Sequence, residues 1–240
     1  MELASRYFDS VTELLRRVRE EEVEAVGRAA GMVAATVTEG GTVFASGAGH
    51  SALIAQDLVY RAGGLALVNL LAIPGATGVA TVPATLGTAL ERLSGLAAAA
   101  LDTSPARAGD LLLVVSLSGK NALPVELASH ARQRGLRVIG LTSAAAYGGR
   151  LADHCDVVLD TKVPVGDAAL TAEGVGAPFG PVSTVVGAAL AQAVMAEAAG
   201  LLAARGITPP VLRSANVDGG REWNDRLLAQ HADRILWRRA

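Results

Sequence analysis

Short apolar runs alternate with longer amphipathic segments along most of this chain. Runs of strand length and mainly apolar composition lie at 42–46, 65–70, 111–116, 136–141 and 157–160. Several of the segments between them carry apolar residues at helical spacing and end at a glycine. A strand, a turn, a helix and a glycine that recur in this order are typical of a doubly wound parallel sheet. We therefore predict an α/β fold of this kind.

The helical segments predict one domain with an extension at each end. Residues 3–38 are expected to form one long N-terminal helix, because apolar positions such as Leu14 and Val18 recur opposite a charged face. Shorter or later helices are expected at 52–62, 86–100, 124–134, just before 151, at 181–204 and in the tail. We assign residues 1–240 to a single domain, with the N-terminal helix inside 1–40 and a helical tail at 205–240.

Composition excludes several classes of protein. The chain has 240 residues, a net charge of −2 and only 3% aromatic residues, which argues against a nucleic-acid surface. The lone Cys155 excludes a disulfide framework and fits a reducing compartment. No uninterrupted apolar run of about 18 residues occurs, and the N-terminus does not read as a signal peptide. We expect a soluble cytoplasmic protein without membrane or nucleic-acid partners.

Two predicted loops combine glycines with hydroxyl and amide side chains. The first loop is 46–51, which contains Gly49 and Ser51, and the second is 116–121. Both follow a predicted strand, and ligands of parallel sheets bind at the carboxyl ends of the strands. Glycines let backbone N–H groups approach an anion, and the following helix adds partial positive charge. The predicted phosphate-binding residues are Gly49, Ser51, Ser116, Ser118, Gly119 and Asn121.

The two loops, in the setting of the apolar run after Asp110, make the chain resemble the sugar isomerase (SIS) domain family of phosphosugar-binding proteins. Further matching motifs lie at 50–51, 60–64, 166–168, 181–184 and 216–220, and are similar to those of single-domain bacterial members. The resemblance implies a five-stranded, flavodoxin-like parallel sheet. It also implies a homodimer or homotetramer with sites near the subunit interface, and a sugar phosphate as ligand.

The resemblance further implies an acid and a base, because SIS enzymes move a proton at the carbon beside a sugar carbonyl. In a related branch, a glutamate on the helix after the first loop serves, and Asp57 occupies the matching stretch here. Glu173, in a glycine-flanked loop, and His50, beside Ser51, are the other candidate catalytic residues. Asp167 ranks next. Each of these residues also fits an ordinary surface, capping or hydrogen-bonding role.

Metal binding is poorly supported, because the chain has no paired histidines or cysteines at ligand spacing. We expect no metal and no other cofactor.

The favoured function is an enzyme acting on an amino-sugar or N-acetylhexosamine 6-phosphate. Proton abstraction would lead either to aldose–ketose isomerisation or to β-elimination by a lyase or dehydratase. The alternative is a non-catalytic phosphosugar sensor.

Overall fold

Five parallel strands form one sheet at the centre of the molecule. The computed structural model describes residues 2–80 and 82–238. The strands are β1 (Val43–Gly47), β2 (Val68–Leu70), β3 (Leu111–Val115), β4 (Arg137–Thr142) and β5 (Val157–Asp160). Their order in the sheet is β2-β1-β3-β4-β5, and every pair is parallel. The predicted flavodoxin-like α/β fold is confirmed.

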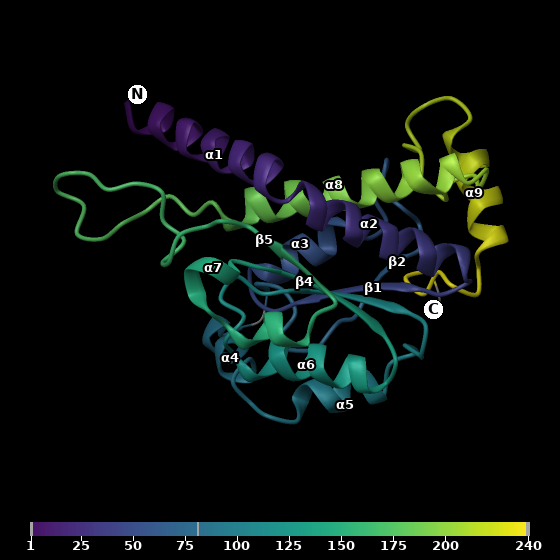
Figure 1. Ribbon diagram of the computed structural model, residues 1–240, viewed down its shortest axis with the longest axis horizontal. Helices are drawn as coiled ribbons and strands as arrows, with labels where there is room; N and C mark the ends of the chain where they lie inside the picture. The colour runs from purple at the N-terminus through teal and green to yellow at the C-terminus, as the bar shows by residue number, and fades with distance from the viewer. Residues whose placement is uncertain (1, 81, 239–240) are drawn as a thin grey trace.

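Helices cover both faces of this sheet (Figure 1). One face carries α2 (Val23–Thr38), α3 (Ser51–Asp57) and α8 (Ser183–Ala204), with α1 (Glu2–Glu21) packed on α8. The other carries α4 (Ala84–Leu90), α5 (Leu96–Asp102), α6 (Ala122–Gln133) and a 3-10 turn at Arg150–His154. Two more helices are α7 (Ala144–Tyr147), after β4, and α9 (Gly220–Gln230), in the tail.

The alternation of side chains along each strand divides the core in two. In β3, Leu111, Leu113 and Val115 join the cluster beneath α2 and α8, whereas Leu112 and Val114 join the cluster beneath α5 and α6. All five are buried, because helices cover both faces. A central strand that is covered on both faces therefore requires a continuous apolar run of this length.

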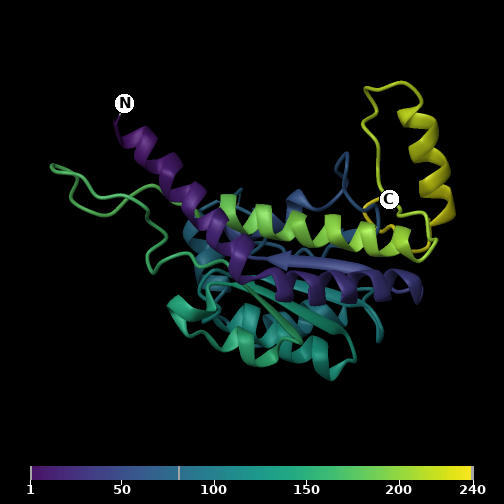
Figure 2. The ribbon, with the colours of Figure 1, turned by 45° about the horizontal axis from the view of Figure 1, so that its top comes forward.

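The long N-terminal helix expected at 3–38 is two helices, which is a correction. Helix α1 ends at Glu21 and α2 begins at Val23, and α1 leans away from the body beyond this joint (Figure 2). The backbone N–H of Glu22 still bonds Val18, so the break is a bend rather than a loop. Glu22 is buried, with its carboxylate bonded to the end of β5. That tertiary contact is invisible to the helical pattern.

Three other boundaries differ from the sequence expectation. The helix expected at 86–100 is two short helices, α4 and α5, because the chain turns at 91–95 and Gly95 has a φ of +87°. The helix expected at 52–62 ends at Asp57, and the strand expected at 65–70 pairs only from Val68. At each of these places the element ends where the chain must turn between the sheet and its helices, and not where local helix or strand propensity ends.

Helix α8 is strongly apolar, although Gln192 and Glu197 interrupt its apolar residues. Among the described residues it is the one helix long and apolar enough to cross a membrane, judged by length and composition. It packs against α1, α2 and α3, as the core helix of a globular protein does. Only 44% of its most apolar window is buried in the single chain.

Candidate functional site

A cavity of about 610 Å³ lies at the carboxyl ends of the central strands. Strands β1 and β3 are neighbours, but the chain leaves β1 towards β2 and leaves β3 towards β4. This reversal of direction is where doubly wound sheets open a crevice. The polar residues that line the cavity are Ser46, His50, Ser51, Glu91, Ser116, Ser118, Asn121, Thr161, Asp167, Ser183 and Thr184.

The first loop turns tightly between β1 and α3. A Cβ at Gly47 would lie 2.8 Å from the Ser51 carbonyl, so a side chain at this position cannot fit. Gly49 has a φ of +51°, and its N–H donates to the Ala76 carbonyl at 3.0 Å. Ser51 and His50 therefore line the cavity, while Gly49 shapes the loop and is not among the lining residues.

The second loop leaves two serine hydroxyls ready to donate. The Ser116 Oγ accepts the Gly119 N–H at 3.2 Å, and the Ser118 Oγ accepts the Lys120 N–H at 3.4 Å. Because each oxygen is used as an acceptor, its own proton can be donated to a ligand oxygen. Gly119, with a φ of +60°, is engaged within the loop and does not line the cavity. The site therefore offers hydroxyl donors rather than the amide of Gly119.

Glu91 is a cavity residue that the sequence analysis missed. It caps the end of α4, and its Oε2 accepts a hydrogen bond from the Asn121 side-chain amide at 2.6 Å. A Cβ at Gly49 would lie 3.4 Å from its Oε1, so the carboxylate sits between the two loops. One amide proton of Asn121 is thus committed to Glu91 rather than to a ligand. No local motif marks Glu91, because α4 and its turn reach the strand ends only in the folded chain.

The structure does not bring the three candidate catalytic residues together. His50 lines the cavity and is exposed. Asp57 is not a lining residue; it forms an ion pair with Arg61 and accepts a hydrogen bond from Gln192 at 2.9 Å. Glu173 is exposed and lies between Leu170 and Phe179, which form an antiparallel bridge. This segment belongs to a long excursion that leaves the body after β5 (Figure 1). The roles of Asp57 and Glu173 remain predictions, and neither is supported by the cavity of a single chain.

Asp167 lines the cavity and also caps α8. Its Oδ1 accepts the N–H groups of Val182 and Ser183 at 3.0 and 2.8 Å, and its Oδ2 accepts the Ser183 hydroxyl at 2.6 Å. A carboxylate at the start of a helix satisfies free N–H groups and complements the helix dipole. The capping role that the sequence left open is thus present in the structure.

Acidic and metal-ligating side chains are dispersed around this cavity. Within residues 2–80 and 82–238, no group of three or more histidine, cysteine or acidic side chains is placed to hold a metal ion. The titratable side chains that line the cavity are those of His50, Glu91 and Asp167.

A doubly wound sheet with a hydroxyl-lined cavity at its switch point defines a class of α/β proteins that bind small ligands. Comparison with known families narrows that class. The SIS domain model matches residues 6–143, so the chain belongs to the SIS domain family. The resemblance read from the two loops is confirmed.

Curated relatives match the chain along nearly its whole length. It is 60% identical over 245 residues to a UPF0309 protein of Streptomyces griseus, with 98% of each chain covered. It is 34% identical over 244 residues to a UPF0309 protein of Shouchella clausii, covering 98% of this chain and 99% of that one. These names state no activity.

Solved structures share the fold at low sequence identity. Phosphoheptose isomerase GmhA of Neisseria gonorrhoeae is 22% identical, with a TM-score of 0.59 and coverage of 83% of this chain and 98% of that one. The sugar isomerase domain of an RpiR transcription factor from Sphaerobacter thermophilus is 19% identical, with a TM-score of 0.54 and coverage of 98% and 100%. The Vibrio vulnificus NanR protein, complexed with ManNAc-6P, is 17% identical, with a TM-score of 0.54 and coverage of 99% and 70%. The fold thus serves both isomerases and regulators.

Proposed function

We propose that this chain binds a sugar phosphate in the cavity and moves a proton at the carbon next to the sugar carbonyl. The observation that carries the proposal is the meeting of Ser51, Ser116 and Ser118, from two separate loops, around one cavity at adjoining strand ends. Several neutral donors converging beside the start of α6 suit the oxygens of a phosphate monoester.

Glu91 is the group we propose for the proton transfer. Its carboxylate lies beside the first loop and is oriented by Asn121 of the second loop. In this role it takes the proton from the carbon beside the carbonyl. The electron pair of the broken C–H bond forms a C=C bond while the carbonyl oxygen gains a proton, which gives an enediol. Return of the proton to the neighbouring carbon completes an aldose–ketose isomerisation. His50 lies on the cavity wall, and we assign to it the proton transfer at the sugar oxygen.

An amino-sugar or N-acetylhexosamine 6-phosphate is the substrate class that we propose. A lyase or dehydratase outcome shares the first step, because an enediol can instead expel an oxygen from the next carbon. The structural neighbour solved with ManNAc-6P is one reason to include that compound among the test ligands.

A phosphosugar sensor is the second candidate function. It is favoured by the positions of Asp57 and Glu173, because neither of these two candidate catalytic residues lines the cavity. One structural neighbour is the sugar isomerase domain of a transcription factor by name, which supports this alternative. The sensor would bind the same ligand without exchanging its protons.

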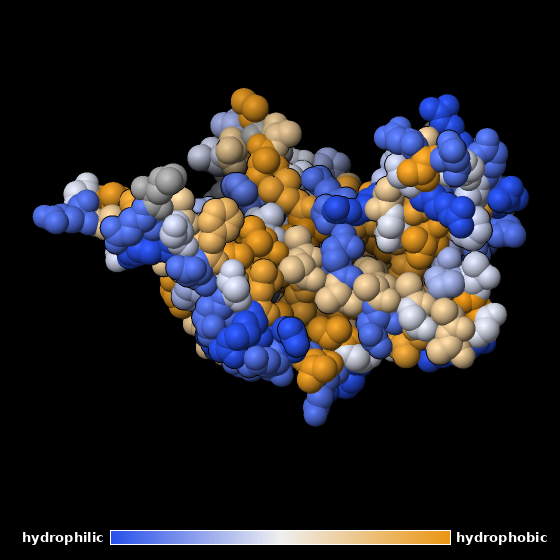
Figure 3. Space-filling model, turned by 90° about the horizontal axis from the view of Figure 1, so that it is seen from above, coloured by the Kyte–Doolittle hydropathy of each residue, from blue (hydrophilic) through white to orange (hydrophobic). Residues whose placement is uncertain are grey.

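We also propose that the chain self-associates and works in the cytoplasm. Figure 3 shows apolar side chains across the middle of the face above α8. Phe8 on α1 is 69% exposed and Val185 on α8 is 44% exposed. A helix that is apolar on all sides and half uncovered is suited to burial against a second copy. The unpaired Cys155 fits a reducing compartment.

The function is tested with a panel of sugar 6-phosphates in deuterated water, followed by NMR. Deuterium incorporation with a ketose product would identify an isomerase, and an unsaturated product would identify a lyase. Binding without exchange would identify a sensor. No binding of any compound would reject the proposal.

Ser118→Ala tests the phosphate contact. We expect affinity for a sugar 6-phosphate to fall about 10-fold or more, because a hydrogen bond to a charged group is lost. Isothermal calorimetry measures the change, with Ser10→Ala on α1 as the control for loss of a serine outside the cavity. Unchanged affinity in the Ser118 variant would remove the phosphate assignment.

Glu91→Gln and Asp57→Asn distinguish the two candidate bases. We expect Glu91→Gln to lose proton exchange while ligand affinity changes little, because the amide keeps the shape but cannot take a proton. Asp57→Asn should retain exchange. The opposite result would return the base role to Asp57, as the sequence predicted.

A further inference from the structure

Thr161 differs from the other buried hydroxyl residues in the described part of the chain. It lines the cavity, is 2% exposed, and its Oγ1 is the one buried side-chain oxygen or nitrogen without a hydrogen-bond partner in the described part of the chain. By contrast, the buried hydroxyls of Ser46, which also lines the cavity, and of Thr142 and Ser143, which do not, each donate to a backbone carbonyl, at 2.9, 3.0 and 2.5 Å. Buried hydroxyls are normally paired, so an orphan beside a cavity indicates a partner supplied from the cavity.

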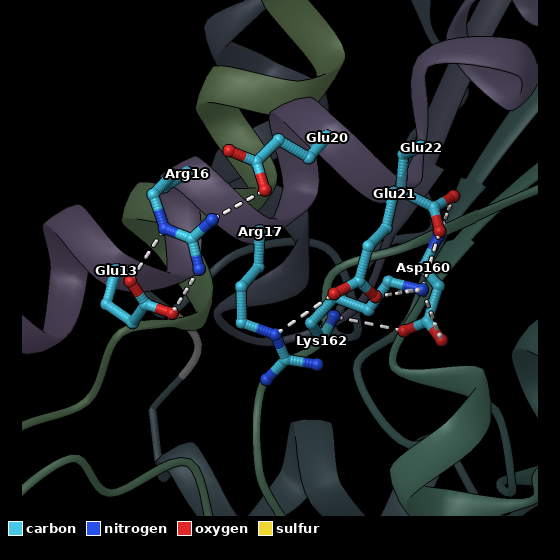
Figure 4. Close-up of polar contacts among 8 residues, drawn as sticks. All are labelled: Glu13, Arg16, Arg17, Glu20, Glu21, Glu22, Asp160 and Lys162. Carbon is cyan, nitrogen blue, oxygen red and sulfur yellow. Dashed lines mark hydrogen bonds and ion pairs between the residues drawn. The ribbon is translucent and has the colours of Figure 1, made fainter.

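Glu22 holds the two residues on either side of Thr161. Its Oε2 accepts the backbone N–H of Asp160 at 3.1 Å, and its Oε1 lies 2.7 Å from the Lys162 ammonium (Figure 4). The carboxylate of Glu22 thus holds the chain on both sides of Thr161. Because Glu22 lies between α1 and α2, these two contacts also connect the cavity wall to the N-terminal helix.

Lys162 maintains an unfavourable backbone conformation next to Thr161. Its φ of +58° is rare for a residue with a side chain. The ammonium lies within 4 Å of Glu21, Glu22 and Asp160. Burial alone would lower the pKa of Lys162, but these carboxylates outweigh it and raise that pKa above its usual value. The ionic contacts of Lys162 thus stabilise a strained backbone next to Thr161. Strain of this kind is typical of sites where a side chain must be held in place.

The charges in this region select the kind of group that Thr161 can receive. Three carboxylates, the Lys162 ammonium and the Arg17 guanidinium bound to Glu21 give the cluster a net charge of −1, and both cations are engaged by carboxylates. The carboxylate of Asp167 is likewise committed to α8. A second anionic group would therefore be repelled here, whereas a neutral hydroxyl can both donate to and accept from Thr161.

We infer that Thr161 bonds a neutral hydroxyl of the ligand, at the end remote from the phosphate, and that Glu22 is the positioning residue that holds Thr161. The inference rests on the proposed function, since it takes the serine loops as the phosphate site. Strand β5 lies two strand spacings, about 10 Å, from β3 in the sheet. A six-carbon sugar phosphate can span that separation, with its phosphate at Ser116 and Ser118.

Thr161→Val and Thr161→Ser test the contact with two kinds of probe. Inorganic phosphate reports on the loops alone. Glucosamine 6-phosphate, N-acetylglucosamine 6-phosphate and N-acetylmannosamine 6-phosphate report on the whole site. We expect the valine variant to bind inorganic phosphate normally and the best sugar 6-phosphate about 3- to 10-fold more weakly, because one hydrogen bond is lost. The serine variant should bind both as the wild type does.

The unliganded valine variant should also melt at the wild-type temperature or a few degrees above it, because an unpaired buried hydroxyl has been removed. Unchanged sugar-phosphate affinity in this variant, or a wild type that binds no sugar 6-phosphate better than inorganic phosphate, would overturn the inference alone. A wild type that binds neither kind of probe would reject the proposed function and the inference together.

Glu22→Gln and Lys162→Met test the positioning role by breaking one ion pair from either side. We expect both to weaken sugar 6-phosphate binding several-fold and to leave inorganic phosphate binding unchanged. Lys162→Arg, which keeps the charge, should preserve the affinity. Glu20→Gln on α1 is the matched control, because Glu20 pairs with Arg16 at the surface. Wild-type affinity in both disrupting variants, or equal losses for both probes, would contradict the role.

Discussion

Four serine hydroxyls at or just after the strand ends differ in the direction of their hydrogen bonds. Ser46 and Ser143 donate to carbonyls, so their protons are committed to the fold. Ser116 and Ser118 accept backbone N–H groups, so their protons remain for a ligand. The same residue type thus serves structure or binding according to which neighbour it meets.

The surroundings of Cys155 predict a low reactivity of its thiol in the folded protein. Burial and the neighbouring charge of Asp156 raise the pKa of its thiol to about 12, and a Cβ at Gly140 would lie 2.5 Å from its sulfur. We expect native protein to react very slowly with a thiol reagent at pH 8, because the thiolate is the reactive form. Unfolding should restore normal reactivity. Rapid stoichiometric labelling of native protein would contradict this.

The same raised pKa predicts a pH dependence of stability. Above pH 9 the unfolded chain loses the thiol proton while the folded chain keeps it up to about pH 12. The unfolded state then binds fewer protons, so the free energy of unfolding falls as the pH rises. Denaturant titrations between pH 8 and 10.5 should show a steeper fall for the wild type than for Cys155→Ala. Parallel curves would refute the assignment.

At the scale of elements, the start of α8 depends on a residue distant in sequence. This helix has 22 residues, and its first N–H groups are satisfied by Asp167, which precedes it by a hairpin. Asp167 has a φ of +51°, which places its side chain beneath the helix at a backbone cost. The cap joins the cavity wall to the core helix.

Asp167→Ala should therefore lower stability by about 1–2 kcal/mol, the value of a helix cap. The melting temperature should fall by roughly 2–8 °C. Asp167→Asn retains an acceptor for the helix N–H groups and should lose less. Thermal unfolding of the two variants measures the difference. Loss of turnover in the asparagine variant without loss of stability would show instead that Asp167 acts in catalysis.

At the scale of the whole molecule, the reversal of strand order places the cavity, and the α1–α8 face is left uncovered in a single chain. The reversal brings loops from β1 and β3 to one cavity. The face above α8 leaves apolar residues such as Phe8 in contact with solvent in a single chain. Burial of that area in a second copy would supply the driving force for association.

Phe8→Asp tests the proposed assembly. We expect wild-type protein to sediment as a dimer or tetramer and the aspartate variant to shift towards monomer, because a charge cannot be buried unpaired. Leu93→Asp is the control, since Leu93 is 54% exposed on the turn between α4 and α5, at the opposite face of the sheet. A monomeric wild type would reject the assembly, and equal effects of both substitutions would reject this face as the interface.

The chain's local patterns determined its fold class and the loops of its site. Apolar runs such as residues 111–115 predict central strands because burial on both faces permits no alternation. Serines and glycines just after such runs predict a ligand loop because strand ends meet at one edge of a parallel sheet. Ser51, Ser116 and Ser118 were found in this way, and the structure places all three at the cavity.

Tertiary structure alone decided the features that depend on contacts between distant segments. Glu91 meets Asn121 across 30 positions, and Glu22 meets Asp160 across 138. Neither pair leaves a periodic or motif signal, since each carboxylate lies in a helical segment that looks ordinary on its own. The bend between α1 and α2 and the carboxylate of the cavity follow from those contacts. The sequence specified which segments form strands and helices, because that choice is local, and only packing specified which side chains face one another.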